Sequence, residues 1–154
     1  MEIVYLADHL EFLPTVALWH HQEWGYLRTG DTLEARAGRL RKECGHAEIP
    51  TTVVAVENGT VLGSAMLIAD DMDTRPQFSP WLASVFVAPE RRRKGIGSAL
   101  VRRIMQEAKR LKVSRLYLYT PDAERFYARE GWKVLERTPY KGKEVTIMSY
   151  EIRG

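Results

Sequence analysis

The sequence predicts an α/β or α+β domain built on a mixed sheet, and three observations support this fold class. Short β-branched or apolar runs alternate with segments of helical periodicity through the centre of the chain. Asn58-Gly59 stands between two apolar runs, which is a strong signal for a β-hairpin. Segment 96–111 places an apolar residue every three or four positions with basic residues between them, which predicts an amphipathic helix with a solvated basic face.

Length and composition are those of one ordinary globular domain, expected to cover residues 1–154. Hydrophobic residues make up 45% and charged residues 28% of the chain. The net charge of +3 allows an anionic ligand without requiring nucleic acid. Cys44 is the only cysteine, so no intrachain disulfide can form, and we expect it to serve in packing. There is neither a basic-then-apolar leader nor an apolar run of about 18 residues, so we expect a cytoplasmic protein that does not span a membrane.

The first half of the chain is predicted to form a strand, two helices and a hairpin. We expect a strand at 2–6, a helix starting at Asp8 or Pro14, a helix capped by Asp31 or Thr32, and strands at 51–56 and 61–68. Pro14 is compatible with the first helix only within its first turn, because proline has no N–H to donate.

The second half is predicted to alternate strands with helices and to end in a strand pair. We expect a loop at 70–80, a strand at 81–87, the helix at 96–111, a strand at 114–119, a helix from Pro121 to Glu130 with Gly131 as its C-cap, and strands at 132–137 and 144–152. The strand at 81–87 is apolar almost throughout, which predicts burial on both faces. Such strands and helices, with the hairpins, indicate a sheet of mixed direction.

A basic, glycine-containing turn joins the strand at 81–87 to the amphipathic helix. The first turn of a helix exposes unpaired N–H groups and carries the positive end of the helix dipole, so it suits a phosphate. Gly95 and Gly97 remove the Cβ atoms that would block such a ligand. The turn is not a Walker loop, since no G-x-x-x-x-G-K-[ST] is present. It is not a Rossmann loop either, because Leu100 stands where the third glycine belongs.

The pattern that remains, R-x-x-G-x-G at Arg92, Gly95 and Gly97, resembles the GNAT superfamily of N-acetyltransferases. A second motif follows about thirty residues later, where Phe126-Tyr127 precedes Gly131-Trp132. Both motifs occur in the family's order and on the expected elements, and the resemblance covers most of the chain. It implies the GNAT fold, a mixed but mostly antiparallel twisted sheet of six to seven strands flanked by about four helices.

The resemblance also implies which residues hold acetyl-CoA. The diphosphate is expected on the backbone of the loop formed by Arg92, Arg93, Lys94, Gly95, Ile96, Gly97 and Ser98. The pantetheine arm is expected along the main chain of Val85, Phe86 and Val87, where the strand separates from its neighbour. Many family members have an asparagine seven residues before the motif tyrosine, a position that Thr120 occupies here, so one cofactor hydrogen bond is expected to differ.

The implied reaction is the transfer of acetyl from acetyl-CoA to a primary amine, by direct attack in a ternary complex. Tyr127 matches the tyrosine that protonates the departing thiolate, as a general acid. The backbone N–H of Phe86 or Val87 is the expected donor to the oxyanion. Several groups are open as the base, with Glu23 as the first choice and the others being Asp70, Asp71, Asp73, His20 and His21.

The acceptor, a small-molecule or peptide amine, is expected between segments 19–31 and 70–81, with Trp24, Asp71, Asp73 and Trp81 as contacts. No metal is expected, because adjacent His20 and His21 point apart on a helix.

A monomer or homodimer without nucleic-acid or membrane partners is predicted. Two alternatives are a non-catalytic acyl-CoA sensor and, more weakly, a nucleic-acid binder that uses the arginines at 91–93 and 102–103.

Overall fold

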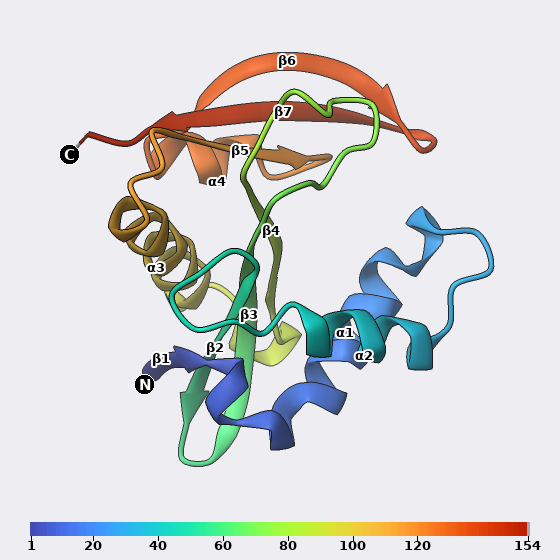
Figure 1. Ribbon diagram of the computed structural model, residues 1–154, viewed down its shortest axis with the longest axis vertical. Coiled ribbons are helices and arrows are strands. Elements are labelled where there is room, and N and C mark those ends of the chain that lie inside the picture. The colour runs from blue at the N-terminus through green and yellow to red at the C-terminus, as the bar shows by residue number, and fades with distance from the viewer. Residues whose placement is uncertain (154) are drawn as a thin grey trace.

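The computed structural model describes residues 1–153, which form one seven-stranded open sheet with four α-helices (Figure 1). In chain order the elements are β1 (Glu2–Tyr5), α1 (Leu13–Trp24), α2 (Leu33–Lys42), β2 (Thr51–Glu57), β3 (Thr60–Ile68), β4 (Trp81–Val87), α3 (Ile96–Arg110), β5 (Arg115–Thr120), α4 (Glu124–Arg129), β6 (Lys133–Tyr140) and β7 (Lys143–Glu151). The strand order is β1-β2-β3-β4-β5-β7-β6. All neighbours are antiparallel except β4 and β5, which confirms the predicted mixed, mostly antiparallel sheet.

Helices cover the two faces of the sheet, with α1 and α2 on one and α3 on the other (Figure 1). Each face of the sheet has its own hydrophobic core, and strand β2 contributes to both. Successive side chains of β2 enter these two cores alternately, because they point to opposite faces of the sheet. Val53 and Ala55 pack with α3, whereas Val54 packs with α1 and α2. Within residues 1–153, no helix has the length and apolar character needed to cross a bilayer.

The amphipathic pattern of α3 is confirmed with one correction. Ile96, Leu100 and Ile104 are buried against the sheet, as predicted. Glu107, which the pattern assigned to the solvated face, is instead only 1% exposed. Its carboxylate accepts from Arg103 Nε (2.9 Å) and from the Tyr5 hydroxyl (2.7 Å), so the buried charge is fully partnered and ties β1 to α3.

The N-terminal helices begin close to the predicted positions. Two short 3-10 turns precede α1, so Asp8 does not cap it, and its carboxylate instead accepts from His46 at 2.6 Å. Pro14 lies in the first turn of α1, where no N–H partner is needed. Thr32 caps α2, with its Oγ1 accepting from the Ala35 N–H at 3.1 Å.

The short helix α4 starts later than predicted. Pro121 does not begin it, because Thr120 Oγ1 accepts from the N–H groups of Asp122 (3.3 Å) and Ala123 (3.0 Å) and holds these residues in a turn. The end of α4 matches the prediction. Gly131 has φ +97°, and a Trp132 N–H to Tyr127 C=O bond of 3.1 Å closes the helix.

Strands β4 and β5 separate soon after they pair, which opens the sheet. Trp81 opposite Tyr117 is the only residue pair in register between them, within the described residues. Beyond it, no strand among residues 1–153 covers the β5 side of β4, as the resemblance implied. The prediction that β4 is buried on both faces is therefore wrong at Ser84, Val85 and Val87, which are half-buried because they border this opening.

Candidate active site

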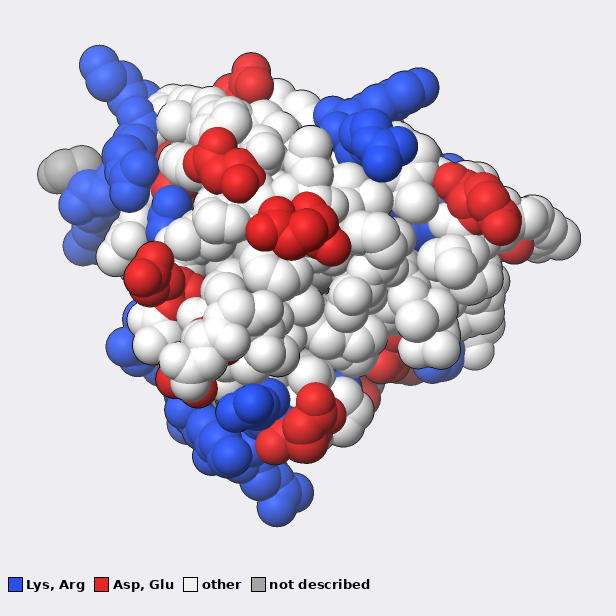
Figure 2. Space-filling model, turned by 90° about the horizontal axis from the view of Figure 1, so that it is seen from below, with Lys and Arg blue, Asp and Glu red and all other residues white. Residues whose placement is uncertain are grey.

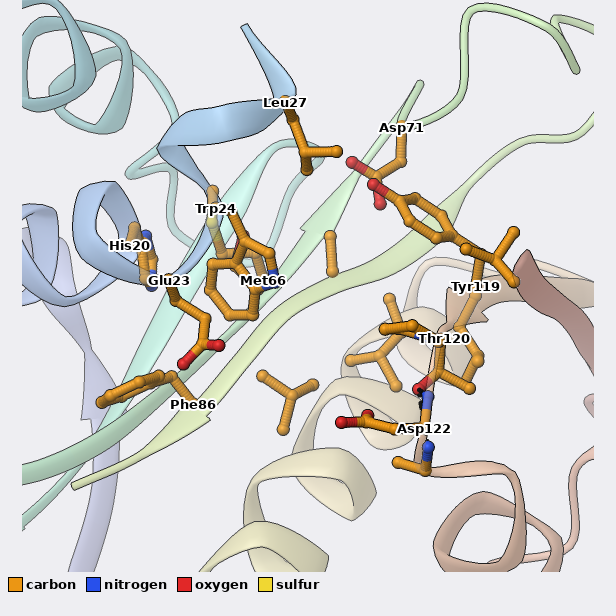
Figure 3. A pocket seen from close by; sticks show the side chains of 18 of the residues that line it. His20, Glu23, Trp24, Leu27, Met66, Asp71, Phe86, Tyr119, Thr120 and Asp122 are labelled. Atoms are coloured by element: carbon orange, nitrogen blue, oxygen red, sulfur yellow. Dashed lines mark hydrogen bonds between the residues drawn. The ribbon is translucent and has the colours of Figure 1, made fainter. Parts of the chain in front are cut away.

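A cavity of about 1160 Å³ occupies the opening between β4 and β5. Its walls come from α1, the 70–80 loop, β4, the head of α3, β5 and the start of α4 (Figure 3). The cavity therefore runs from the predicted phosphate loop to the predicted acceptor segments. Both halves of the site that the sequence suggested separately belong to one continuous space.

The head of α3 is built to accept an anion. Gly95, just before the helix, has φ +82° and makes no side-chain capping bond, while Arg93 also adopts a positive φ of 65°. Ala99 N–H is the first to find a partner in the helix, at Gly95 C=O (3.1 Å). The preceding N–H groups at 96–98 are left for a ligand, and such a run of amides forms an anion-binding concavity. The residues present thus fit a diphosphate.

Two basic residues of the loop are placed differently from each other. Arg92 lines the cavity, its Nε donating to Val87 C=O at 2.9 Å and its guanidinium lying 5.3 Å from the Phe86 ring centroid. Lys94, predicted to contact the cofactor, is outside the cavity lining and exposed. Its charge can act on a bound diphosphate only through the general field of the loop.

The strand register decides which β4 amides face the cavity. Ala88 N–H donates to Leu62 C=O at 2.9 Å, so alternate residues of β4 direct their backbone groups toward β3. By this parity Phe86, opposite Ser64, faces β3, whereas Val87 faces the cavity. Of the two oxyanion donors predicted from the resemblance, only the Val87 N–H is directed into the site.

Tyr127 lies in α4, is 9% exposed and lines the cavity. Phe126 and Trp132 hold the ring edge-on, at centroid distances of 5.0 and 6.3 Å. Burial, and secondarily the charge of Asp122, raise the pKa of Tyr127 well above its usual value. The phenol therefore keeps its proton at neutral pH, which is the form that a proton donor needs.

Thr120, which replaces the family's asparagine, also borders the cavity. Its Oγ1 already accepts the two N–H bonds of the turn before α4, so only its O–H proton can serve a ligand. The site therefore offers one donor at this position where an amide side chain would offer a donor and an acceptor.

The acceptor half combines aromatic rings with carboxylates. Figure 3 shows Glu23 and Trp24 reaching in from α1, and Asp71 lying beside Tyr119 on the opposite wall. Trp24 contacts the Phe86 ring edge-on at 6.3 Å. Burial, with a contribution from the Glu43 charge, raises the pKa of Asp71 to about 7. Asp71 thus changes charge near neutral pH.

Of the remaining predicted acceptor contacts, one reaches the cavity and one does not. Asp73 lies on the rim, exposed, with its carboxylate 3.9 Å from Lys141 Nζ. Trp81 is a correction, since its side chain is fully buried and its indole N–H donates to Phe78 C=O at 2.7 Å. It supports the floor beneath Tyr119 but does not line the cavity.

Tyr26, Tyr119 and Tyr140 line the acceptor half and were missed by the sequence reasoning. The position of Tyr119 could have been predicted. Side chains two residues apart in a strand lie on the same face, so Tyr119 lies on the face of Tyr117, toward the 70–80 loop. The other two rings come from a loop after α1 and from the β6–β7 hairpin. No local pattern in those segments indicates that they meet.

His20 is withdrawn from the candidate bases, because both of its ring nitrogens are engaged in hydrogen bonds. It is 2% exposed, with Nε2 2.8 Å from Ser64 Oγ and Nδ1 2.8 Å from Arg36 Nη2. Burial, reinforced by the Arg36 charge, lowers its pKa to about 3. Glu23, Asp70, Asp71, Asp73 and His21 line the cavity and stay as candidates.

The low pKa of His20 predicts an acid-dependent loss of stability. Below pH 6.5 the His20 ring is protonated in the unfolded chain but stays neutral in the folded protein. The free energy of unfolding therefore falls by about 1.4 kcal/mol per pH unit. Urea unfolding at pH 7.5 and 5.5 should show that the wild type loses about 1.4 kcal/mol more than His20→Gln over this interval. Equal losses in the two proteins would contradict the assigned burial of a neutral His20.

Within residues 1–153, no cluster of three or more His, Cys, Asp or Glu side chains could hold a metal ion. The site lies where the parallel strand pair of the open mixed sheet diverges beside the uncapped head of α3. The family model of the acetyltransferase (GNAT) family matches residues 13–132. The chain belongs to this family and is an acyl-CoA-dependent N-acyltransferase by class.

Solved structures share the fold over two thirds or more of the chain. An aminoglycoside 6'-N-acetyltransferase complexed with coenzyme A has a TM-score of 0.77 at 16% identity, covering 100% of this chain and 98% of that one. A ribosomal-protein-alanine N-acetyltransferase from Brucella melitensis has a TM-score of 0.75 at 19% identity, covering 99% and 100%. A GNAT family acetyltransferase from Elizabethkingia anophelis with acetyl-CoA bound has a TM-score of 0.54 at 16% identity, covering 67% and 76%. No curated protein matches the sequence.

Proposed function

We propose that this protein transfers an acetyl group from acetyl-CoA to a primary amine, by direct attack in a ternary complex. The observation that carries the proposal is the single cavity that joins the uncapped head of α3 to a wall of carboxylates and aromatic rings. The 96–98 amides hold the diphosphate, and the cavity-facing main chain of Val85 and Val87 holds the pantetheine arm and the acyl group at its end. The family and the CoA-bound structural neighbours support the same cofactor.

The reaction needs one proton donor and one proton acceptor, and we place them on opposite sides of the cavity. Acetyl-CoA, when bound, supplies a thioester carbonyl that a neutral amine can attack. The protonated Tyr127 lies on the α4 side and donates to the leaving sulfur as a general acid. Glu23 reaches in from α1 on the opposite side and takes the proton of the amine, directly or through water.

The acceptor half favours an amine that carries positive charge. Two of its guanidinium groups are neutralised within the protein, since Arg39 pairs with Asp31 (2.8 Å) and Arg36 with Glu43 (3.3 Å), whereas Arg28 also lines the cavity. Asp70, Asp71 and Glu23 have no ion-pair partner within the described residues and line the cavity. The Trp24 and Tyr119 rings add faces on which an ammonium group can rest, while the Tyr26 ring is already contacted by Lys143 Nζ, 4.5 Å from its centroid.

The rival functions are less well supported. A sensor that binds acyl-CoA without turnover would not need a buried, protonated Tyr127 at the cavity. A nucleic-acid surface on α3 is disfavoured because Arg102 pairs with Glu130 (2.8 Å) and Arg103 with Glu107 (2.9 Å). On the face shown in Figure 2, acidic groups also lie between separate basic groups. We retain a single cytoplasmic domain, acting as a monomer or homodimer, as part of the proposal.

The test is turnover of acetyl-CoA with a panel of primary amines that includes mono-, di- and polyamines, amino sugars and lysine peptides. Free thiol release and the mass of the acetylated product are measured together. We expect acetylation of at least one amine, with cationic acceptors preferred. Tight acetyl-CoA binding with no turnover across the panel would favour the sensor, and no binding at millimolar acetyl-CoA would reject both functions.

Asp71 should set the lower limit of the pH range for a cationic acceptor. Because its pKa is raised to about 7, it is neutral below that pH and can attract the ammonium group only above it. We expect kcat/KM for the best panel amine to rise through an inflection near pH 7. Asp71→Asn should remove the inflection and lower kcat/KM at pH 8 by about 10- to 100-fold, the value of one charged hydrogen bond. Asp70→Asn, next to it on the rim, should retain the inflection.

A further inference from the structure

Strand β4 contains an irregularity at the place where it borders the cavity. Ser64 of β3 is opposite Phe86 and Met66 is opposite Ala83, so Ser84 and Val85 together face the single residue Ala65. This is a β-bulge, and Ser84 takes up a left-handed φ of +51° in it. A serine at positive φ is strained and persists only where surrounding groups hold it there, so the contacts of Ser84 are informative.

The Ser84 carbonyl is anchored by a buried hydrogen-bond relay whose direction can be derived. A guanidinium can only donate, so Arg36 Nη2 donates to His20 Nδ1 (2.8 Å), and the ring proton must lie on Nε2. His20 Nε2 then donates to Ser64 Oγ (2.8 Å), whose single proton goes to Ser84 C=O (3.1 Å). His20 and Ser64 are 2% and 0% exposed, so water does not compete for these bonds.

The anchored carbonyl determines where the next amide points. The only cis bonds within the described residues precede Pro50 and Pro80, so the Ser84–Val85 peptide is trans. A planar trans peptide directs its C=O and N–H to opposite sides. With the Ser84 C=O drawn toward Ser64 on β3, the Val85 N–H is directed away from β3, toward the opening where Val85 lines the cavity. Val85 has no register partner on β3 or β5.

We propose that His20 and Ser64 are positioning residues that aim the Val85 N–H at the acyl group in the cavity. This inference rests on the proposed function. An amide aimed at a carbonyl that gains negative charge stabilises the transition state, and losing such a donor lowers kcat by about 10²–10³-fold. Arg36 belongs to α2, His20 to α1 and Ser64 to β3. The hydrogen bonds of the relay therefore connect these three elements to the Ser84 carbonyl of β4 and hold its orientation.

The experiment compares Ser64→Ala with a matched loss of a buried hydroxyl. Thr51→Val removes a hydroxyl that donates to Gly45 C=O at 2.6 Å in β2, away from the cavity. The readouts are the ¹H–¹⁵N resonance of Val85 with acetyl-CoA and with CoA, and kcat and KM for the best panel amine. In the wild type, we expect acetyl-CoA to move the ¹H–¹⁵N resonance of Val85 to a position that CoA alone does not produce; we call this difference the Val85 shift. In Ser64→Ala, we expect the Val85 shift to be lost and kcat to be about 10-fold or more lower, while the affinity for CoA stays within about 2-fold of the wild-type value.

His20 provides a rescue that a purely structural role would not show. His20→Gln keeps a donor for Ser64 and an acceptor for Arg36 and should retain the Val85 shift, whereas His20→Leu should behave like Ser64→Ala. Thr51→Val should lose stability but keep the Val85 shift and kcat. Equal effects of Thr51→Val and Ser64→Ala, or an unchanged acetyl-CoA-specific shift in Ser64→Ala, would overturn the inference alone. A wild type that binds no acetyl-CoA would instead overturn the proposed function with it.

Discussion

Gly97→Trp is expected to abolish detectable acetyl-CoA binding while leaving the protein folded. Gly97 is the second residue of α3, and a Cβ there would be 3.5 Å from the Phe126 ring, an ordinary contact, so the backbone itself tolerates a side chain. An indole at this position would cover the 96–98 amides, to which we propose that the diphosphate binds. Losing several charge-assisted hydrogen bonds of about 1.5–3 kcal/mol each corresponds to at least about 10³-fold in affinity. Titration calorimetry with acetyl-CoA measures the effect.

The matched control for that change is Gly38→Trp. Gly38 is also a glycine within a helix, α2, where a Cβ would have nothing within 4 Å, and it does not line the cavity. We expect this variant to bind acetyl-CoA as the wild type does. If Gly97→Trp kept its affinity while its α3 amides stayed unperturbed by NMR, the diphosphate would have to bind elsewhere, and the central assignment of the site would be wrong.

Tyr127→Phe is expected to lower kcat by about 10²-fold or more, with the affinity for acetyl-CoA nearly unchanged. The change removes only the phenolic hydroxyl, and the Phe126 and Trp132 rings that hold the side chain keep their contacts. Without the hydroxyl, the leaving sulfur has lost its proton donor, and general-acid catalysis contributes about 10²–10⁴-fold. Steady-state kinetics with the best panel amine, together with calorimetry, separates the two quantities.

Tyr150→Phe is the control for the loss of a phenol near the same helix. Tyr150 packs against Trp132 at a centroid distance of 5.6 Å but lies outside the cavity lining. Its kcat should match that of the wild type. A Tyr127→Phe enzyme with wild-type kcat would remove Tyr127 from the reaction and leave it as a packing residue of the α4 core.

Elements with a local physical cause were predictable from the sequence. The Asn58-Gly59 turn, the Thr32 cap and the Gly131 helix end all depend on hydrogen bonds or dihedral angles within a few residues, and all three occur as predicted. Where a local rule had a competitor, it failed. Pro121 does not start α4, because the Thr120 hydroxyl holds the intervening residues in a turn. Glu107 is buried, because Tyr5 and two arginines partner its charge.

The cofactor half of the site was also readable from the sequence, since its parts lie close together in the chain. Strand, basic turn and helix head follow one another within 81–110, so spacing alone places the glycines against the first amides of α3. The motif cannot indicate which β4 amides face the ligand. That depends on the pairing with β3, and one bulge at Ser84 changes the direction of the next peptide.

By itself, then, the sequence determined the fold class, because local periodicity specifies it. The proposed phosphate site at the head of α3 followed from backbone chemistry, and the proposed role of Tyr127 followed from the resemblance to the family. Only the tertiary structure decided the acceptor half. Asp71 lies beside Tyr119 on one wall of the cavity, Trp81 lies beneath Tyr119, and His20 of α1 contacts Ser64 of β3. The Asp71–Tyr119 and His20–Ser64 contacts join residues tens of positions apart. Long-range pairing and burial set them, and neither leaves a periodic trace in the chain.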